Sequence, residues 1–227
     1  MSIKSKFLAA AGTLALAGGM ATAGALSASA ATPPCGHNCI DIFSREFGTH
    51  THPNYVLDVW RQSAKAGTPI ILYRTSNTDK AEDFTVSNQG TVADFYAAGL
   101  VSASLNLHYS SDEAYEFEYS PNGVNSGLCV GTASTAANQT PVVLVPCGAS
   151  AKSVWVVDSA DSIGRGYVPL INGSDTNFSH PYVLHYPGNA FPTDTPRPQL
   201  NTYELQKYSN NSVFDNELWG ANFGVLR

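Results

Sequence analysis

Two glutamates at alternate positions are the first candidates for chemistry in this sequence. Glu116 and Glu118 lie in the run from Tyr115 to Tyr119, and in a strand their side chains share one face. A pair of carboxylates is what glycoside hydrolysis needs, one as the acid and the other as base or nucleophile. Such pairs are also common on solvated strand faces, and the sequence has no Gly-x-Ser-x-Gly, His-Glu-x-x-His or phosphate-cradling glycine loop. We therefore predict that the protein is not an enzyme and assign no catalytic residue.

Two short segments carry side chains of the kind that bind metals. Cys35, His37 and Cys39 lie close together, but three ligands from so small a loop need a distant fourth, and extracellular thiolates tend to oxidise. His50 and His52 alternate in an expected loop, and no third ligand is indicated there. The sequence therefore predicts neither a metal site nor a cofactor.

The first thirty residues have the organisation of a secretory signal peptide. Lys4 and Lys6 precede an apolar stretch of small residues from Phe7 to Leu26, and Ala28-Ser29-Ala30 follows as a small-x-small cleavage site. A membrane anchor is the alternative, because about 20 apolar residues span a bilayer. The richness in Gly, Ala and Thr and the cleavage site favour export. We expect residues 1–30 to be removed and the mature protein to be secreted and extracellular, with no membrane association.

The composition and net charge of the chain indicate which kinds of partner it can bind. The chain is 43% hydrophobic and only 13% charged, which is enough apolar surface for a packed core. Its 12 Lys and Arg against 18 Asp and Glu give a formal net charge of −6, and no basic residues cluster. Nucleic acid is excluded as a partner, because binding to phosphates needs a positive patch.

The cysteines predict two disulfides. All four lie after the signal peptide, and an even number in an oxidising compartment favours complete pairing. Proximity suggests Cys35–Cys39 and Cys129–Cys147, although four cysteines allow three different pairings.

Short runs rich in β-branched and aromatic residues recur along the chain. No stretch keeps a 3.6-residue apolar period, and only Thr91 to Leu100 has room for a helical turn or two. Many short strands separated by turn residues predict an all-β sandwich or barrel. The expected strands are Tyr55–Val59, Pro69–Tyr73, Glu82–Val86, Ser104–Tyr109, Tyr115–Tyr119, Pro141–Val145, Val154–Val157, Pro181–Leu184 and Thr202–Leu205.

One pattern occurs three times. Gly67-Thr68-Pro69-Ile70-Ile71-Leu72 has a counterpart at Pro141 and a weaker one at Pro181. An aromatic-centred strand follows each of these, and another strand precedes each. The aromatic residues are Phe84, Trp155 and Tyr203, and the preceding strands are Leu57–Val59, Cys129–Val130 and Val168–Leu170. No single unit can bury its apolar face alone, so three units are expected to share one core.

These repeats resemble the ricin-B-type β-trefoil family. The family unit reads roughly Cys-Leu-Asp-Val, then Gly-Thr-Pro-Val-x-Leu-Trp, then Gln-x-Trp. Val56-Leu57-Asp58-Val59, Gly67 to Tyr73 and Glu82-Asp83-Phe84 follow it with similar spacing. Cys129 and Cys147 stand where such lectins place a disulfide within a repeat, so the resemblance supports that pairing.

The resemblance implies an all-β, β-trefoil-like fold with three pseudo-repeats. We place this domain at residues 55–227, with residues 31–54 as an N-terminal extension and residues 88–119 as an inserted or extended segment. A chain of two domains, divided near Gln89, is the alternative.

Sugar binding is the function that the resemblance implies. Each family repeat uses an Asp after its first strand, an aromatic ring, and an Asn just before the Gln-x-Trp motif. By position the first repeat has Asp58 and Tyr73, with Ala81 at the Asn position and Glu82 at the Gln position. The other two repeats have, at the Asp and aromatic positions, Gly131 with Val145 and Leu170 with His185. This implies one incomplete sugar site; a turn-capping Asp58 and a half-buried Tyr73 are the structural alternatives.

A small loop, Cys35-Gly36-His37-Asn38-Cys39, precedes the first repeat. Bridging its cysteines adds little stability, because the gain grows with loop length, but it pre-shapes a knob that loses little entropy on docking. A simple N-terminal clasp is the alternative. Together with the signal peptide, the size and the degenerate sugar positions, the loop resembles, more weakly, the small secreted adaptor subunit of bacterial umbrella-toxin particles.

Our leading hypothesis is therefore a protein–protein adaptor in an extracellular complex, with this loop as the part that binds a secreted partner. The alternative hypothesis is a carbohydrate-binding lectin, with a glycan as its partner and Asp58, Tyr73 and Glu82 as its site.

Overall fold

The computed structural model describes residues 35, 39–47, 55–76, 78–163, 166–188 and 198–223. The expected signal peptide, the two alternate histidines of residues 50–52 and residues 36–38 of the small loop lie outside these ranges. Within the described ranges, no helix is long and apolar enough to cross a lipid bilayer. The described residues belong to one compact unit.

Among the described residues, six antiparallel strands close into a barrel. They are β1 (Ile40–Ser44), β4 (Phe84–Thr91), β5 (Glu113–Tyr119), β8 (Trp155–Val157), β9 (Leu170–Asn172) and β12 (Trp219–Phe223). Each pairs with the next in this order, and β12 pairs back with β1. The circle is completed by a bridge between Val168, just before β9, and Trp219. A closed barrel leaves no open sheet edge, which removes a site for aggregation.

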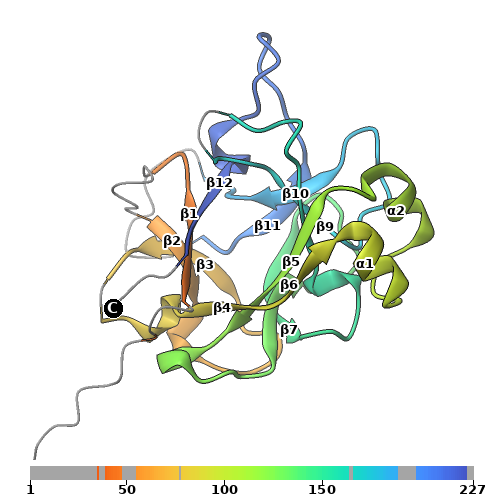
Figure 1. Cartoon of the computed structure of the whole chain (residues 1–227). Coiled ribbons are helices and arrows are strands. Elements are labelled where there is room, and N and C mark those ends of the chain that lie inside the picture. Colours follow the sequence, from red (N-terminus) through yellow and green to blue (C-terminus); the bar gives the residue numbers. More distant parts are fainter. Residues whose placement is uncertain are drawn as a thin grey trace, which may run out of the picture. The chain divides into compact units, whose positions relative to one another are not determined.

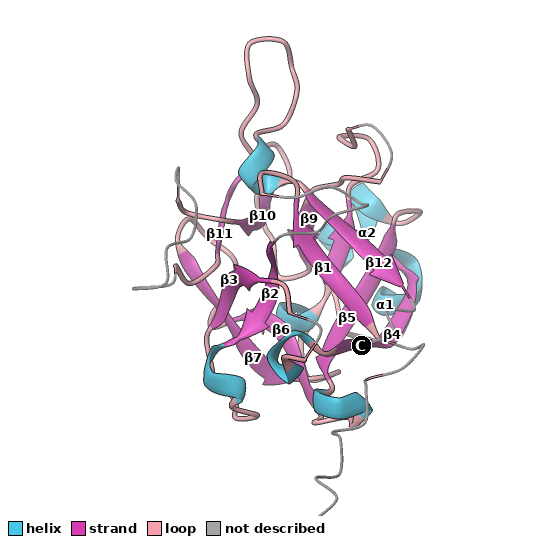
Figure 2. Cartoon of the chain, turned by 90° about the vertical axis from the view of Figure 1, so that its left-hand side faces the viewer, coloured by secondary structure: helices cyan, strands magenta, loops and turns pink. Residues whose placement is uncertain are grey.

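Three β-hairpins lie at one end of this barrel. They are β2 (Tyr55–Val59) with β3 (Ile70–Arg74), β6 (Leu128–Thr132) with β7 (Thr140–Pro146), and β10 (Tyr182–His185) with β11 (Asn201–Glu204). Figure 2 shows these hairpin strands on the left and the barrel strands β1, β12 and β4 on the right. The hairpins also touch one another, through bridges at Pro69–Val143 and Ile71–Gln199 and through pairing of Thr140 with Thr202.

The three-fold repetition is a barrel strand, a hairpin, a short 3₁₀ helix and a second barrel strand. The 3₁₀ helices η2 (Lys80–Glu82), η4 (Ala151–Ser153) and η5 (Asp215–Glu217) each end two residues before a buried ring. Those rings are Phe84, Trp155 and Trp219. The two indole groups donate hydrogen bonds to equivalent hairpin carbonyls, of Val130 at 2.9 Å and Leu184 at 2.8 Å. This is the β-trefoil architecture, as the resemblance implied.

Apolar side chains from all three units meet inside the barrel and under the hairpins. Strand residues alternate between the two faces of a sheet, and the inward set forms one cluster. Besides the three rings it includes Ile40, Ile42, Leu57, Ile70, Val130, Leu144, Leu184 and Leu200. Two further 3₁₀ helices, η1 (Trp60–Gln62) and η3 (Pro121–Gly123), lie in connections between strands.

The third repeat is displaced from the position that the sequence pattern suggested. Pro181 precedes β10, the counterpart of β2 and β6, whereas Pro69 directly precedes β3 and Pro141 lies within β7. Tyr203 therefore belongs to a hairpin, and the true third aromatic strand begins at Trp219. The assignment was wrong because a proline before a strand is a weak marker on its own.

The barrel begins earlier in the chain than expected. Ile40–Ser44 lies in the segment assigned to an N-terminal extension, yet it is the first barrel strand, and all five of its residues are buried. It pairs with the last strand, from Ile40 opposite Phe223 to Ser44 opposite Trp219. Its short sequence mixes Ile40, Ile42 and Phe43 with the buried polar residues Asp41 and Ser44, so short-range patterns did not separate it from the loop before it.

Two helices are inserted between the first and second repeats (Figure 1). They are α1 (Val92–Ala97) and α2 (Ala103–Tyr109). A capping box between Thr91 and Asp94 starts α1, and the Ser102 side chain caps α2. The strand expected at Ser104–Tyr109 was therefore wrong, although a helical turn within Thr91–Leu100 was predicted.

The insertion is narrower than residues 88–119. Residues 88–91 and 113–119 are barrel strands, and Gln89 pairs with Tyr115 in the middle of the β4–β5 ladder. The chain is therefore continuous through Gln89 rather than divided there. Val92, Phe95 and Leu105 anchor the helices on a second apolar cluster that includes Val156 and Ile171.

Candidate functional site

Each hairpin offers one position where the family holds a sugar, and strand pairing identifies all three. Asp58 on β2 lies opposite Ile71, Gly131 on β6 lies opposite Val143, and His185 on β10 lies opposite Asn201. The aromatic position follows on the partner strand, at Tyr73, Val145 and Tyr203. The position before the Gln-x-Trp motif falls on the 3₁₀ helices, at Ala81, Lys152 and Asn216.

The first repeat brings Asp58 and Glu82 together in its interior. Carboxyl oxygens of Asp58, Asp79 and Glu82 all lie within 4.8 Å of one another, and Asp58 and Glu82 are buried. Glu82 accepts hydrogen bonds from the Ser76 amide at 3.0 Å and the Thr75 hydroxyl at 3.2 Å. Burial, and then the charge of Asp58, raise the pKa of Glu82 to about 8.

These bonds suit a structural role in the first repeat. Asp79 accepts the Ala81 amide as the cap of η2 and the Gln62 amide, each at 2.9 Å, so two of the three carboxylates hold local backbone. Carboxylate oxygens at this spacing are also the ligand type of Ca²⁺. Tyr73 is half-buried on β3 opposite Val56. The three residues predicted as a sugar site, Asp58, Tyr73 and Glu82, thus lie in the same repeat. The carboxylates of Asp58 and Glu82, however, are buried in the protein.

At the equivalent position of the second repeat, the space beside Gly131 is occupied by the protein. A Cβ atom on Gly131 would lie 2.5 Å from the Val145 side chain and 2.7 Å from the Lys152 carbonyl oxygen. Both distances are shorter than van der Waals contact, so the glycine is required and the space is filled by the protein itself.

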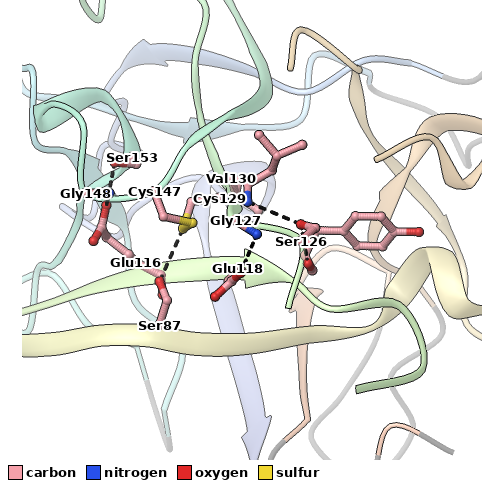
Figure 3. The surroundings of a disulfide bond; sticks show 12 residues. Ser87, Glu116, Glu118, Ser126, Gly127, Cys129, Val130, Cys147, Gly148 and Ser153 are labelled. Atoms are coloured by element: carbon pink, nitrogen blue, oxygen red, sulfur yellow. Dashed lines mark hydrogen bonds between the residues drawn. A yellow bond between two sulfur atoms is a disulfide. The ribbon is translucent and has the colours of Figure 1, made fainter. Parts of the chain in front are cut away.

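Glu116 and Glu118 support the disulfide of the second repeat (Figure 3). Cys129 on β6 is bonded to Cys147, just after β7. Glu116 accepts hydrogen bonds from the Gly148 amide at 2.8 Å and the Ser153 hydroxyl at 2.5 Å. Glu118 accepts the Gly127 amide at 2.6 Å. Both glutamates are buried, and each holds backbone close to one of the two cysteines, Gly127 before Cys129 and Gly148 after Cys147.

The third repeat carries a cavity of about 710 Å³, which we call the third-repeat pocket. Its walls come from the β10–β11 hairpin, the connection from β11 to β12, and the start of β7. The β11–β12 connection projects at the top of Figure 1, in blue. The lining residues are Gln139, Pro141, His185, Pro187, Gln199, Leu200, Asn201, Tyr203, Gln206, Phe214 and Asn216. Five of these side chains are amides, and none is a carboxylate.

His185 lines this pocket and lies between two asparagines. Its Nδ1 is 2.8 Å from Asn201 Oδ1, and its Nε2 is 3.1 Å from Asn216 Nδ2. An amide oxygen accepts and an amide nitrogen donates, so this arrangement selects the neutral ring with hydrogen on Nδ1. Burial lowers the pKa of His185, and the Asn201 contact offsets part of that effect. The ring is therefore uncharged at neutral pH.

Aromatic rings flank the same pocket. The Tyr203 ring centroid is 5.0 Å from that of His185, and Tyr203 is half-buried on β11. Phe214 also lines the pocket, and its ring packs at a tilt against that of Tyr208, 4.2 Å between centroids. Asn216 also donates to the Tyr186 carbonyl at 3.2 Å, which fixes the amide next to His185. The pocket thus combines fixed amide groups with ring surfaces.

This site was not predicted from the sequence, because the repeat pattern placed the third repeat one strand too early. The pattern gave Leu170 and His185 as the Asp and aromatic positions, whereas strand pairing gives His185 and Tyr203. The signal was present in Asn216-Glu217-Leu218-Trp219, an Asn followed by a Gln-x-Trp-like motif with Glu in place of Gln. Glu217 is the counterpart of Glu82, and Asn216 occupies the family's Asn position.

The small N-terminal loop is described only at its ends. Cys35 and Cys39 are joined by a disulfide, as their proximity in the sequence suggested, whereas Gly36, His37 and Asn38 lie outside the described residues. Cys39 is buried directly before β1. A Cβ on Gly123 would lie 3.0 Å from the Cys35 carbonyl oxygen, so the backbone of Cys35 packs against η3.

Comparison with known proteins finds similarity only in structure. No family model and no curated protein matches the sequence. A designed 3-fold symmetric protein, ThreeFoil, superposes with a TM-score of 0.51 at 16% identity, over 81% of this chain and 97% of that chain. An exo-β-1,3-galactanase from Clostridium thermocellum gives 0.51 at 11% identity, over 82% of this chain and 30% of that chain.

This chain therefore spans about a third of the galactanase. A ricin B-like lectin from Macrolepiota procera, solved with lactose, gives a TM-score of 0.47 at 16% identity, over 83% of this chain and 96% of that chain. At such identities, what the chain shares with the first two structures is the β-trefoil fold.

Proposed function

We propose that the protein is a secreted, non-catalytic, carbohydrate-binding β-trefoil that holds a saccharide in the third-repeat pocket. One observation carries the proposal: a cavity of about 710 Å³ at a sugar position of the trefoil, lined by amides and aromatic rings. Its volume is in the range of small-molecule sites, about 300–1,000 Å³.

The lining chemistry fits an uncharged sugar. Amide side chains both donate and accept hydrogen bonds, as neighbouring hydroxyl groups on a pyranose require. The ring of Tyr203 offers an apolar surface to the C–H face of the sugar. His185 replaces the carboxylate that the family uses, so hydroxyls are expected to bind mainly to the side chains of Asn201, Gln199 and Gln139. Export is supported by the expected signal peptide and by the two disulfides.

Replacing Tyr203 with Ala is expected to weaken saccharide binding at least tenfold, because the variant loses the ring surface of the pocket. The measurement is titration of the mature protein with a panel of neutral oligosaccharides, followed by calorimetry and by chemical shifts of the Asn and Gln amides. The matched control is Tyr73→Ala, the same change at the equivalent position of the first repeat, which should leave binding unchanged. Loss of binding in Tyr73→Ala with retention in Tyr203→Ala would move the site to Asp58 and Glu82.

A second candidate function is the adaptor role, in which the loop from Cys35 to Cys39 docks into a secreted protein of an extracellular complex, such as an umbrella-toxin-type particle. It is favoured by the position of the bridge, whose ends are held by η3 and by β1. Fixing both ends of a short loop reduces the entropy that it loses on binding.

Replacing both Cys35 and Cys39 with Ser is expected to abolish capture of a protein partner while the barrel stays folded. A pull-down from culture supernatant with tagged mature protein measures this, with and without competing sugars, and circular dichroism checks the fold. Capture that survives the double substitution would remove the loop from the interface. If competing sugars abolish capture by the unsubstituted protein, the partner binds through the third-repeat pocket and not through the loop.

A further inference from the structure

A second cavity lies where the inserted helices meet the third repeat. It has a volume of about 440 Å³, and we call it the insertion pocket. Tyr109, the last residue of α2, forms one wall, and the loops after β8 and β9 and the segment after β11 form the others. The lining residues are Tyr109, Asp158, Asp161, Phe178, Ser179, His180, Pro181, Leu205 and Lys207. None of them lines the third-repeat pocket, so the two cavities are separate.

The insertion pocket is acidic. Asp158 is buried, and its Oδ1 accepts the amides of Ala160 and Asp161 at 3.1 and 3.2 Å. Asp161 accepts a hydrogen bond from Lys207 Nζ at 2.6 Å. Lys207 carries the one ammonium group among the described lining residues, and it bonds to Asp161; Asp158 has no ion pair with a residue of this lining. Burial, and then the charge of Asp161, raise the pKa of Asp158.

Negative charge also reaches the aromatic wall. Burial, followed by the charges of Asp158, Asp175, Asp112 and Asp161, raises the pKa of Tyr109 to about 12. Four carboxylates thus contribute to the potential at one half-buried ring. The Phe178 ring lies 6.4 Å from Tyr109 and stacks on His108 at 4.4 Å between centroids. Aromatic faces beside carboxylates are favourable surroundings for an organic cation.

We propose that the insertion pocket binds the protonated amino group of an amino sugar, with the ammonium at Asp158 and Asp161 and the ring against Tyr109 and Phe178. The carboxylates supply charge-assisted hydrogen bonds, and the aromatic side chains cover the apolar face of the sugar. The same sugar with an acetylated nitrogen carries no charge and gains nothing from the carboxylates. The proposal does not depend on the third-repeat pocket, which holds no carboxylate.

The test compares a trimer of glucosamine with a trimer of N-acetylglucosamine, by calorimetry on the mature protein near neutral pH. We expect the glucosamine trimer to bind at least tenfold more tightly. Asp158→Asn should remove that preference while it keeps the oxygen that accepts the Ala160 and Asp161 amides. Lys207→Met should instead tighten binding of the glucosamine trimer several-fold, because it removes the competing ammonium. A purely structural role of these residues predicts no such gain.

Two control variants test whether the preference arises from the overall negative charge of the protein or from the third-repeat pocket. Glu113→Gln removes one exposed carboxylate that does not line the insertion pocket and should leave the preference intact. Tyr203→Ala should leave it intact as well, even if binding of neutral sugars is lost. Equal binding of the two trimers would overturn the proposal, and so would an unchanged preference in a folded variant with both Asp158→Asn and Asp161→Asn. Thermal unfolding of each variant establishes that it is folded.

Discussion

Replacing Trp219 with Ala is expected to lower the free energy of unfolding by about 3–5 kcal/mol, the range for removing a large buried aromatic side chain. Its side chain is 1% exposed and lies in the central cluster. Its backbone also forms both hydrogen bonds of the bridge to Val168, at 2.9 and 3.0 Å, that closes the barrel. The substitution would leave a cavity where the barrel closes. The expected loss of stability is large because the surrounding side chains are held by strands on both sides and cannot move in to fill that cavity.

The expected consequence extends to the third-repeat pocket. The Trp219 indole donates to the Leu184 carbonyl at 2.8 Å, and Leu184 directly precedes His185. Removing the indole leaves the Leu184 carbonyl without this hydrogen bond and without the ring that packs beneath the strand carrying His185. Urea denaturation of the mature protein measures the stability. The matched control is Trp60→Ala, at a half-buried residue of η1, which should cost clearly less; equal losses for the two variants would contradict a special role of the third ring.

The stability of the protein is expected to fall as pH rises from about 4.5 to about 8. Burial raises the pKa of Glu217 from 4.5 to about 8, and the hydrogen bond from the Gln206 amide opposes this only in part. Below pH 4.5 the side chain is protonated in both the folded and the unfolded protein. Between pH 4.5 and about pH 8, Glu217 is deprotonated in the unfolded protein but still protonated in the folded protein. The free energy of unfolding therefore decreases as the pH rises through this range. Above about pH 8 the full loss of about 3–5 kcal/mol is reached.

Glu217→Gln is expected to flatten this dependence and to raise stability above neutral pH. The amide oxygen can still accept the Gln206 amide hydrogen, which Glu217 accepts at 2.8 Å. Urea denaturation at several pH values measures both slopes. Glu82 has a similarly raised pKa, so a variant with Glu82→Gln as well should be flatter still. In the second repeat the same position is Ser153, which does not titrate in this range. A steeper slope in Glu217→Gln than in the wild type would show that Glu217 is ionised in the folded protein.

The sequence was sufficient for the fold because the trefoil depends on a few repeated positions. Phe84 and Trp155 lie at the end of recognisable motifs, and both became central rings. Trp219 was missed because residues 186–198 lengthen the third repeat, so equal spacing no longer identifies its strands. Ser104 to Tyr109 was taken for a strand because Leu105, Leu107 and Tyr109 alternate. In the structure Leu105 is buried and Leu107 is 81% exposed, so this helix owes its form to its cap and to one anchoring side chain.

The candidate sites were harder to predict than the fold. Asp58 and Glu82 were correctly placed in one repeat, but local sequence does not tell whether a carboxylate is open or covered. The third-repeat pocket depends on the connection from β11 to β12, whose Phe214 and Asn216 approach His185 only when the barrel closes. The insertion pocket requires α2 to place Tyr109 beside Asp158, residues that are far apart in the chain. Such contacts arise from tertiary structure and leave no short-range pattern.

The pairing of the first and last strands decides how the domain responds to mechanical load. Because β1 and β12 are antiparallel neighbours with Ile40 opposite Phe223, the chain enters and leaves the barrel at the same place. Tension applied to both ends of the chain then breaks the hydrogen bonds between β1 and β12 one after another. In a shear geometry all of these bonds would have to break together. A partner pulling on one end against an anchor at the other would open the barrel at low force. If the partner were instead bound in the pockets, the force would act on the hairpins, and the pairing of β1 with β12 would stay intact.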